Sequence, residues 1–283
     1  MRQALFLFVI ALSLRAGQTG VERAEDLYQK TDYAASLDVL RGVAKPDAAV
    51  YCLMGRDYMM LGDFKKATDA LERAASLEPN KSEYSLWLGR AWGRRAETSS
   101  LFTAPSSAAK ARDAFERAVQ LDPKNLEALS DLFDYYLQAP GFLGGGEDKA
   151  ANLAARMAEI NPAEYQFSQA QLAERRKEYN SAEEHFRRAV ELAPRHVGRF
   201  IELARYLAKR GRNQESEAVW AQAEKVAPGN AQVMFWRAKT YVQQNRNLDQ
   251  AQNLLKRYLR SELTPDDPPR EEAEQLLKKA IGV

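Results

Sequence analysis

The chain has 283 residues, with 41 Lys and Arg against 39 Asp and Glu, two histidines and one cysteine, so its formal net charge is +2. A charge so nearly balanced lacks the positive field that nucleic-acid binding requires, and we expect no nucleic-acid partner. Neither an internal disulfide nor a zinc site can be built from one cysteine and two scattered histidines, His185 and His196, so we expect no metal and no cofactor.

The N-terminal segment, residues 1–20, differs from the rest of the chain. Its stretch Ala4–Leu14 is eleven residues long and carries no charge. A bilayer core of roughly 30 Å needs a longer helix, whereas the central region of a secretory signal has about this length. We expect a signal peptide over residues 1–20 and an exported, periplasmic or extracellular protein without an integral membrane segment after its removal. The alternatives are an uncleaved N-terminal membrane anchor and a frayed first helix.

A repeated pattern runs through the remainder of the chain. Small side chains lie twelve and five positions before a proline, and large ones lie eight and two positions before it, as in Ala67, Leu71, Ala74, Leu77 and Pro79. Offsets of four, three and three residues place these side chains on one face of a helix, which the proline then prevents from continuing. The prolines of the five copies are Pro79, Pro123, Pro162, Pro194 and Pro228.

The stretch before this helix has its own pattern, most complete over Ala48–Lys81. A stripe of aromatic, apolar and small side chains is followed by a turn glycine: Tyr51, Met54, Gly55, Tyr58 and Gly62. Together with the second helix and its proline, this pattern resembles the tetratricopeptide repeat, a helix–turn–helix unit of about 34 residues. The resemblance covers residues 21–260. It implies an all-α, TPR-like α-solenoid, a right-handed superhelix of about seven helix pairs with a C-terminal capping helix.

The helix pairs should stack as one domain over residues 21–283, because each pair can bury its apolar stripe only against its neighbours. The expected pairs are Val21–Arg41, Ala48–Leu77, Ser82–Leu121, Asn125–Ile160, Ala163–Leu192, His196–Val226 and Ala231–Arg260. A last helix at 270–281 follows the proline-rich stretch Ser261–Pro269. Four apolar side chains should let this helix cap the end of the stack: Ala273, Leu276, Leu277 and Ile281.

Two gaps between the marker prolines exceed the repeat length, with 44 residues from Pro79 to Pro123 and 39 residues from Pro123 to Pro162. Insertions in repeat arrays occur in turns, so we predict long turns at residues 98–109 and 139–148. Each joins the first helix of a pair to the second. They should therefore lie beside each other on one edge of the array.

The second long turn contains three consecutive glycines, Gly144–Gly146. It superficially resembles a phosphate-binding loop. However, no lysine directly follows the last glycine, no Ser or Thr comes after it, and no strand precedes it. We expect the glycines to shape a tight path into the next helix. The alternative is a ligand-contacting loop, with Phe142 and Leu143 as exposed apolar contacts.

The resemblance also implies a binding surface, because the first helices of such repeats line a concave groove with places five and nine of each unit. Place five is occupied by Cys52, Leu86, Ser130, Phe167, Ile201 and Phe235. Place nine is occupied by Arg56, Arg90, Asp134, Gln171, Arg205 and Lys239. An apolar row beside a mainly basic row suits an extended or helical peptide with hydrophobic anchors and acidic groups. The alternative is that place five is half buried between helices and the basic side chains are merely solvated.

No catalytic set is evident, since His185 and His196 lie in separate repeats and Cys52 has no base beside it. We expect a non-catalytic scaffold or adaptor in the cell envelope that binds protein partners through its groove. One alternative is an accessory component of a transport system that binds a small molecule or a lipid. Another is an enzyme or the regulatory subunit of an enzyme, and the sequence leaves homo-oligomerisation open.

Overall fold

The computed structural model describes residues 20–100 and 102–282, and the predicted signal segment lies almost wholly outside them. All regular secondary structure in these ranges is helical, which confirms the all-α, solenoid-like fold class. Where the sequence predicts one continuous domain, the chain forms two compact units, which meet between Lys149 and Ala150. This division follows the long connection at residues 139–146. We call residues 20–149 the N-terminal unit and residues 150–282 the C-terminal unit.

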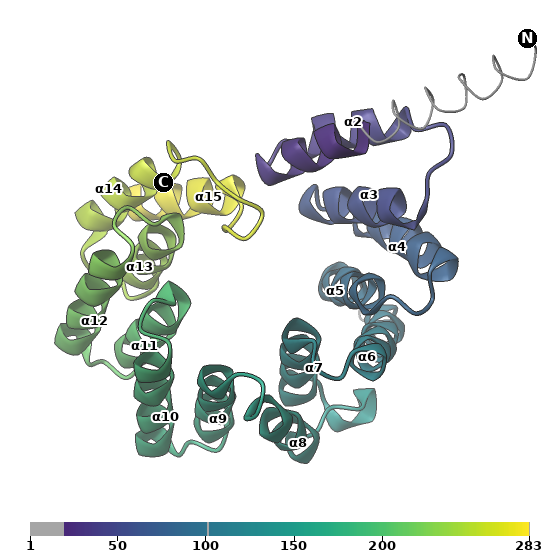
Figure 1. The fold of residues 1–283 in the computed structure, drawn as a ribbon. Coiled ribbons are helices and arrows are strands. Elements are labelled where there is room, and N and C mark those ends of the chain that lie inside the picture. Colours follow the sequence, from purple (N-terminus) through teal and green to yellow (C-terminus); the bar gives the residue numbers. More distant parts are fainter. Residues whose placement is uncertain (1–19, 101, 283) are drawn as a thin grey trace, which may run out of the picture. The chain divides into compact units, whose positions relative to one another are not determined.

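The N-terminal unit consists of consecutive helical hairpins (Figure 1). Residues 20–29 are helical, and the following elements are α2 (Tyr33–Arg41), α3 (Ala48–Met60), α4 (Phe64–Leu77), α5 (Ser82–Thr98), α6 (Ala104–Leu121), α7 (Leu126–Gln138) and the 3₁₀ turn η1 (Gly141–Leu143). Carboxylate and amide side chains accept a hydrogen bond from the first turn of four of these helices, which sets where each begins. These caps are Asp32, Asp47, Asp63 and Asn125.

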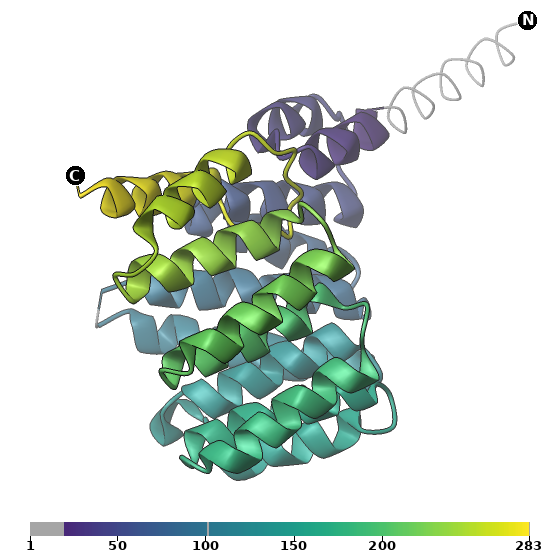
Figure 2. The ribbon, with the colours of Figure 1, turned by 90° about the vertical axis from the view of Figure 1, so that its left-hand side faces the viewer.

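Helix α8 (Glu147–Met157) contains the boundary, and the C-terminal unit continues the hairpin pattern. Its helices are α9 (Pro162–Arg175), α10 (Tyr179–Leu192), α11 (Val197–Lys209), α12 (Asn213–Val226), α13 (Ala231–Gln243), α14 (Leu248–Tyr258) and α15 (Arg270–Ile281). Within this unit, neighbouring helices run alongside one another (Figure 2). Pro162 does not stop α8 as the pattern suggests, because α8 already ends at Met157. It is the first residue of α9, where its missing N–H costs nothing.

Close packing between paired helices explains the glycine in two of the first helices, α3 and α5. A Cβ added at Gly55 would lie 2.4 Å from Leu71 Cγ, and one at Gly89 would lie 2.5 Å from Phe115 Cδ1. Leu71 and Phe115 are the large side chains eight positions before their prolines. Glycine in the first helix therefore makes room for the large residue of the second.

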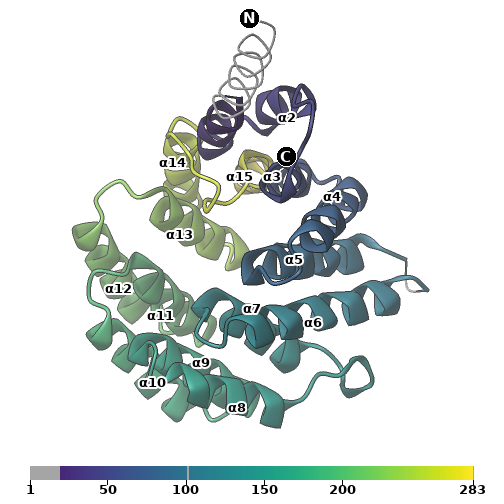
Figure 3. The same cartoon turned by 45° about the vertical axis from the view of Figure 1, so that its right-hand side comes forward.

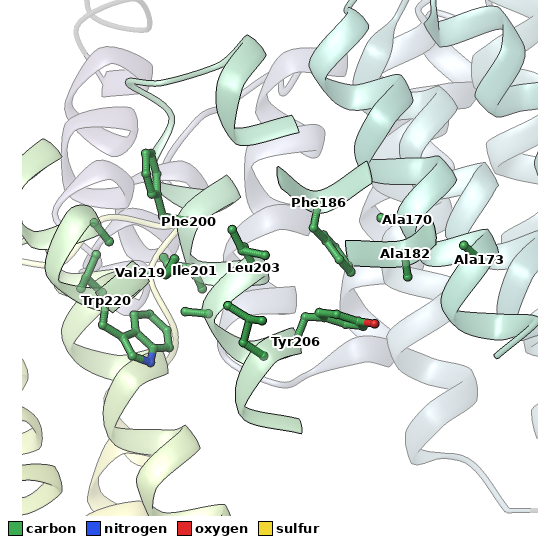
Figure 4. Packing of buried hydrophobic residues seen from close by; sticks show 14 residues of the cluster. Ala170, Ala173, Ala182, Phe186, Phe200, Ile201, Leu203, Tyr206, Val219 and Trp220 are labelled. Atoms are coloured by element: carbon green, nitrogen blue, oxygen red, sulfur yellow. The ribbon is translucent and has the colours of Figure 1, made fainter. Parts of the chain in front are cut away.

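The core follows the predicted helix face with one exception. The small positions, such as Ala67 and Ala182, are fully buried. Figure 4 shows the cluster of the C-terminal unit, where the Phe186 and Tyr206 rings lie 5.0 Å apart. The exception is the large residue two positions before the proline, for which the predicted burial in the core is wrong. Leu77, Leu192 and Val226 are each more than one third exposed, because each is the last residue of its helix.

The predicted long turn at 98–109 is wrong in its extent. Helix α5 continues to Thr98 and α6 begins at Ala104, so most of the insertion lengthens these two helices to 17 and 18 residues. They pack along each other (Figure 3). Pro105 lies in the first turn of α6, where a proline is tolerated, and Ser107 is buried. The serine- and proline-rich stretch here therefore contains the start of α6 rather than a long loop.

The connection between α7 and α8 is held by hydrogen bonds from side chains of α6 and α7. The Leu143 carbonyl accepts from the Tyr135 hydroxyl at 2.8 Å and from Arg112 Nη1 at 3.3 Å. Gly144 has a φ of +87°, which a residue with a side chain rarely adopts. A Cβ at Gly145 would lie 1.8 Å from the Ala139 carbonyl oxygen. The glycines therefore shape the path of the chain.

Helix α15 packs against α13 and α14. Its buried residues are Ala273, Leu276 and Ala280, and Leu277 is partly buried against the same cluster. The prediction for Ile281 is wrong, because this side chain is about half exposed at the last position of the helix. Ala280 takes its place in the core.

Candidate functional site

The place-five residues are mostly buried in the helix stack. Leu86, Ile201 and Phe235 are at most 3% exposed, while Phe167 is half buried. The Phe235 ring packs against the rings of Trp236 and Tyr258, with centroids 5.3 Å away in both cases. The prediction that Leu86, Ile201 and Phe235 form an open apolar row is therefore wrong. These side chains fill the space between adjacent helices.

Cys52 shares this buried environment and is inert for the same reason. Burial raises the pKa of its thiol to about 12, so the reactive thiolate is scarce at neutral pH.

The basic residues of place nine in the N-terminal unit lie on an aromatic ring. The Trp87 ring has the Arg56 guanidinium 4.9 Å from its centroid and the Arg90 guanidinium 4.7 Å from it. Arg90 also bonds to Asp131 at 2.5 Å and Glu127 at 2.9 Å, both on α7. These two arginines are thus paired with groups of neighbouring helices.

The C-terminal unit repeats this arrangement around Trp236. Arg205 lies 4.3 Å and Lys239 4.7 Å from the ring centroid. Arg205 pairs with Glu202 at 2.7 Å, and Lys239 pairs with Glu272 of α15 at 2.7 Å. The predicted basic row is therefore largely neutralised by the chain itself. Neither tryptophan was among the predicted groove residues, although each lies three positions before a place-nine cation, on the same helix face.

Two hollows open on the first-helix side of the C-terminal unit. The first, of about 400 Å³, lies where α9, α11 and α13 end, and its lining includes Glu174, Phe186, Glu202, Tyr206, Lys209 and Gln243. An ion pair of 2.6 Å joins Lys209 to Glu174 across neighbouring repeats. The second, of about 490 Å³, lies between α13 and α15, and its lining includes Lys239, Val242, Gln243, Glu272, Leu276 and Lys279. Gln243 lines both hollows, so they adjoin, and we call the two together the C-terminal groove.

The predicted loop contacts differ from each other. Phe142 is 82% exposed, whereas Leu143 is partly buried. The connection between α5 and α6 has a second such side chain, Phe102, which is 95% exposed and which the sequence analysis did not single out. Both phenylalanines belong to helix–helix connections of the N-terminal unit.

The histidines take part in no cluster suited to a metal. His185 Nδ1 lies 2.6 Å from the Gln166 amide oxygen, and His196 is exposed at the start of α11. Over residues 20–100 and 102–282, no group of three or more His, Cys, Asp or Glu could hold a metal ion. In the same ranges, no helix combines the length and the apolar character that crossing a bilayer requires.

Comparison with known proteins agrees with the helical hairpins. One family model described as tetratricopeptide repeat matches residues 201–268, and another with the same description matches residues 48–81 and 163–196. Among curated proteins, none is similar enough in sequence to count as a relative.

Two solved structures share the fold. A tetratricopeptide repeat protein from Parabacteroides merdae has a TM-score of 0.61 at 17% identity, covering 94% of this chain and 99% of its own. A thermophilic TPR protein from Thermus thermophilus has a TM-score of 0.55 at 17% identity, covering 68% and 98%. At these identities the likeness concerns the fold alone. Together with the family models and the helix-pair geometry, it shows that the chain contains tetratricopeptide repeats.

Proposed function

We propose that the chain is a non-catalytic protein–protein interaction module that binds an extended or helical peptide in the C-terminal groove. Tetratricopeptide repeats generally mediate interactions between proteins. The observation that carries the proposal is the pair of adjoining hollows, which share Gln243 and follow the first helices. Two adjoining hollows that are lined by residues of several repeats suit an extended chain better than a compact ligand.

The groove offers both kinds of contact that a peptide needs. Apolar contact comes mainly from the second hollow, where Val242 and Leu248 are partly exposed. In the first hollow, Phe186 and Tyr206 are part of the lining but are each only 4% exposed. Charged and amide side chains form the rims. Apolar surface with a few polar groups is typical of binding sites. Both hollows are open to solvent, which favours a peptide over the small molecule or lipid of the alternative reading.

A bulky side chain at Gln243 should block the groove. Gln243 is exposed, so Gln243→Trp fills space that both hollows share without disturbing the core. The probe is a random peptide library displayed on phage and selected on the immobilised full chain. We expect the wild type to enrich peptides and Gln243→Trp to weaken the binding of the selected peptides about tenfold, roughly 1.4 kcal/mol.

Gln250→Trp is the matched control, because Gln250 is an equally exposed glutamine on α14, away from the lining given for either hollow. It should bind the selected peptides like the wild type. Equal binding by Gln243→Trp and the wild type would place the binding surface elsewhere.

We further propose that the protein works in the cell envelope. The support is the uncharged stretch Ala4–Leu14 alone. Fractionation of cells that express the C-terminally tagged full chain should recover it outside the cytoplasm. Replacing Leu7 and Ile10 by aspartate should retain it inside, because charges interrupt the apolar core of a signal. Cytoplasmic recovery of the unaltered chain would contradict this location.

A further inference from the structure

The net positive charge of the C-terminal groove lies in its second hollow. Three charged residues are in its lining: Lys239, Glu272 and Lys279. Lys239 and Glu272 neutralise each other in their 2.7 Å ion pair. Lys279 is exposed and has no ion-pair or hydrogen-bond partner for its side chain among the residues that the structure describes. One positive charge is therefore left for a ligand.

The first hollow lacks such an excess. Its two cations are each paired, Lys209 with Glu174 at 2.6 Å and Arg205 with Glu202 at 2.7 Å. Electrostatic selection in the groove therefore depends on the hollow that α15 helps to build.

Amide side chains complete the rim of the second hollow. Gln243 and Gln275 are both exposed, and neither side chain is engaged by another group within the described part of the chain. Each amide offers two donors and an acceptor. An extended peptide presents unpaired N–H and C=O groups along its edge, which such amides can satisfy.

The floor of the second hollow is apolar, with Val242, Leu248 and Leu276. We infer that this hollow selects a peptide segment in which an apolar side chain stands beside an Asp or Glu, with Lys279 as the residue that determines the acidic preference. The inference rests on the proposed peptide-binding function. It assigns to α15 a part in recognition, in addition to covering the end of the core.

The size of the effect follows from the exposure of Lys279. An exposed ion pair contributes little, and reversing one charge replaces attraction by repulsion of similar size. We therefore expect Lys279→Glu to weaken the binding of the acidic peptides about three- to tenfold, and the difference to shrink at high salt.

Adjacent lysines on α15 supply a matched control. Lys278 is also exposed but is not part of the lining of the hollow, so Lys278→Glu changes the net charge equally. The phage library is selected separately on the wild type, Lys279→Glu and Lys278→Glu. The wild type and Lys278→Glu should enrich Asp or Glu beside the apolar residue, whereas Lys279→Glu should lose this preference or favour Lys and Arg.

Three results would overturn the inference. Wild-type selection without an acidic preference would remove its basis, while the proposed function would survive if Gln243→Trp still blocked binding. An equal loss of the acidic preference in both lysine variants would show that the net charge of the protein, rather than a contact with Lys279, selects acidic peptides. The absence of any enrichment that Gln243→Trp blocks would overturn the inference and the proposed function together.

Discussion

Replacing Trp220 by alanine should lower the free energy of unfolding by about 3–5 kcal/mol. Trp220 on α12 is fully buried and is the largest such side chain of the described residues. It belongs to the cluster that includes Phe200 and Val219 (Figure 4). Truncation to alanine leaves a cavity that the helices around it cannot close, because they are fixed by their own neighbours. Urea unfolding followed by far-UV circular dichroism measures the change.

Trp220→Phe provides the control for this prediction. Within the described part of the chain, the buried indole Nε1–H of Trp220 has no hydrogen-bond partner. Phenylalanine keeps much of the aromatic contact and removes this unpaired donor, whose burial is unfavourable. Trp220→Phe should therefore destabilise far less than Trp220→Ala. Equal losses would show that the position depends on the full indole volume.

Stability should also fall as the pH rises from about 4 to 7, because of Asp57. Its carboxyl group on α3 is wholly buried, and the Ser36 hydroxyl of α2 donates to Oδ2 at 2.8 Å. Oδ1 lacks a hydrogen-bond partner among the described residues. Burial raises the pKa of Asp57 from 3.8 to about 7, a shift that the Ser36 hydrogen bond and the Arg56 charge oppose and that Glu25 supports.

Stability falls with rising pH because the pKa of Asp57 is higher in the folded chain than in the unfolded chain. Below pH 4 the carboxyl group is protonated in both the folded and the unfolded chain. Between the two pKa values only the unfolded chain ionises, which favours unfolding, and above pH 7 the full loss is present. A shift of this size corresponds to a loss on the order of 2–4 kcal/mol.

Asp57→Asn should remove this part of the pH dependence, since an amide keeps the acceptor for Ser36 and cannot ionise. The variant should be the more stable protein at pH 8 and should lose this advantage near pH 4. Hydrogen exchange of residues 33–41 and urea unfolding at both pH values would measure the difference. Parallel pH profiles for the two proteins would contradict a buried, protonated Asp57.

The groove could be predicted only in part, and particular residues show why. The sequence correctly places Arg205 and Lys239 on first helices, because their register follows from helical periodicity. It does not reveal that Lys239 pairs with Glu272, 33 positions later, or that Arg90 pairs with Asp131, 41 positions later. These pairings remove charges that the repeat pattern presents as available. The reverse holds for Lys279. The sequence places this residue only on the predicted capping helix, whereas the structure places it in the lining of the second hollow.

The sequence by itself determined the helical hairpins. Buried small residues such as Ala67 and Ala182, the turn glycine Gly62 and the marker prolines act within one repeat, where periodicity and backbone sterics suffice. Only the tertiary structure decided which first-helix side chains are open to a partner. Leu86, Ile201 and Phe235 are buried in the helix stack, and the hollows around Gln243 are formed by residues of several helices together. Exposure is a property of neighbours in space, which a pattern along one helix does not contain.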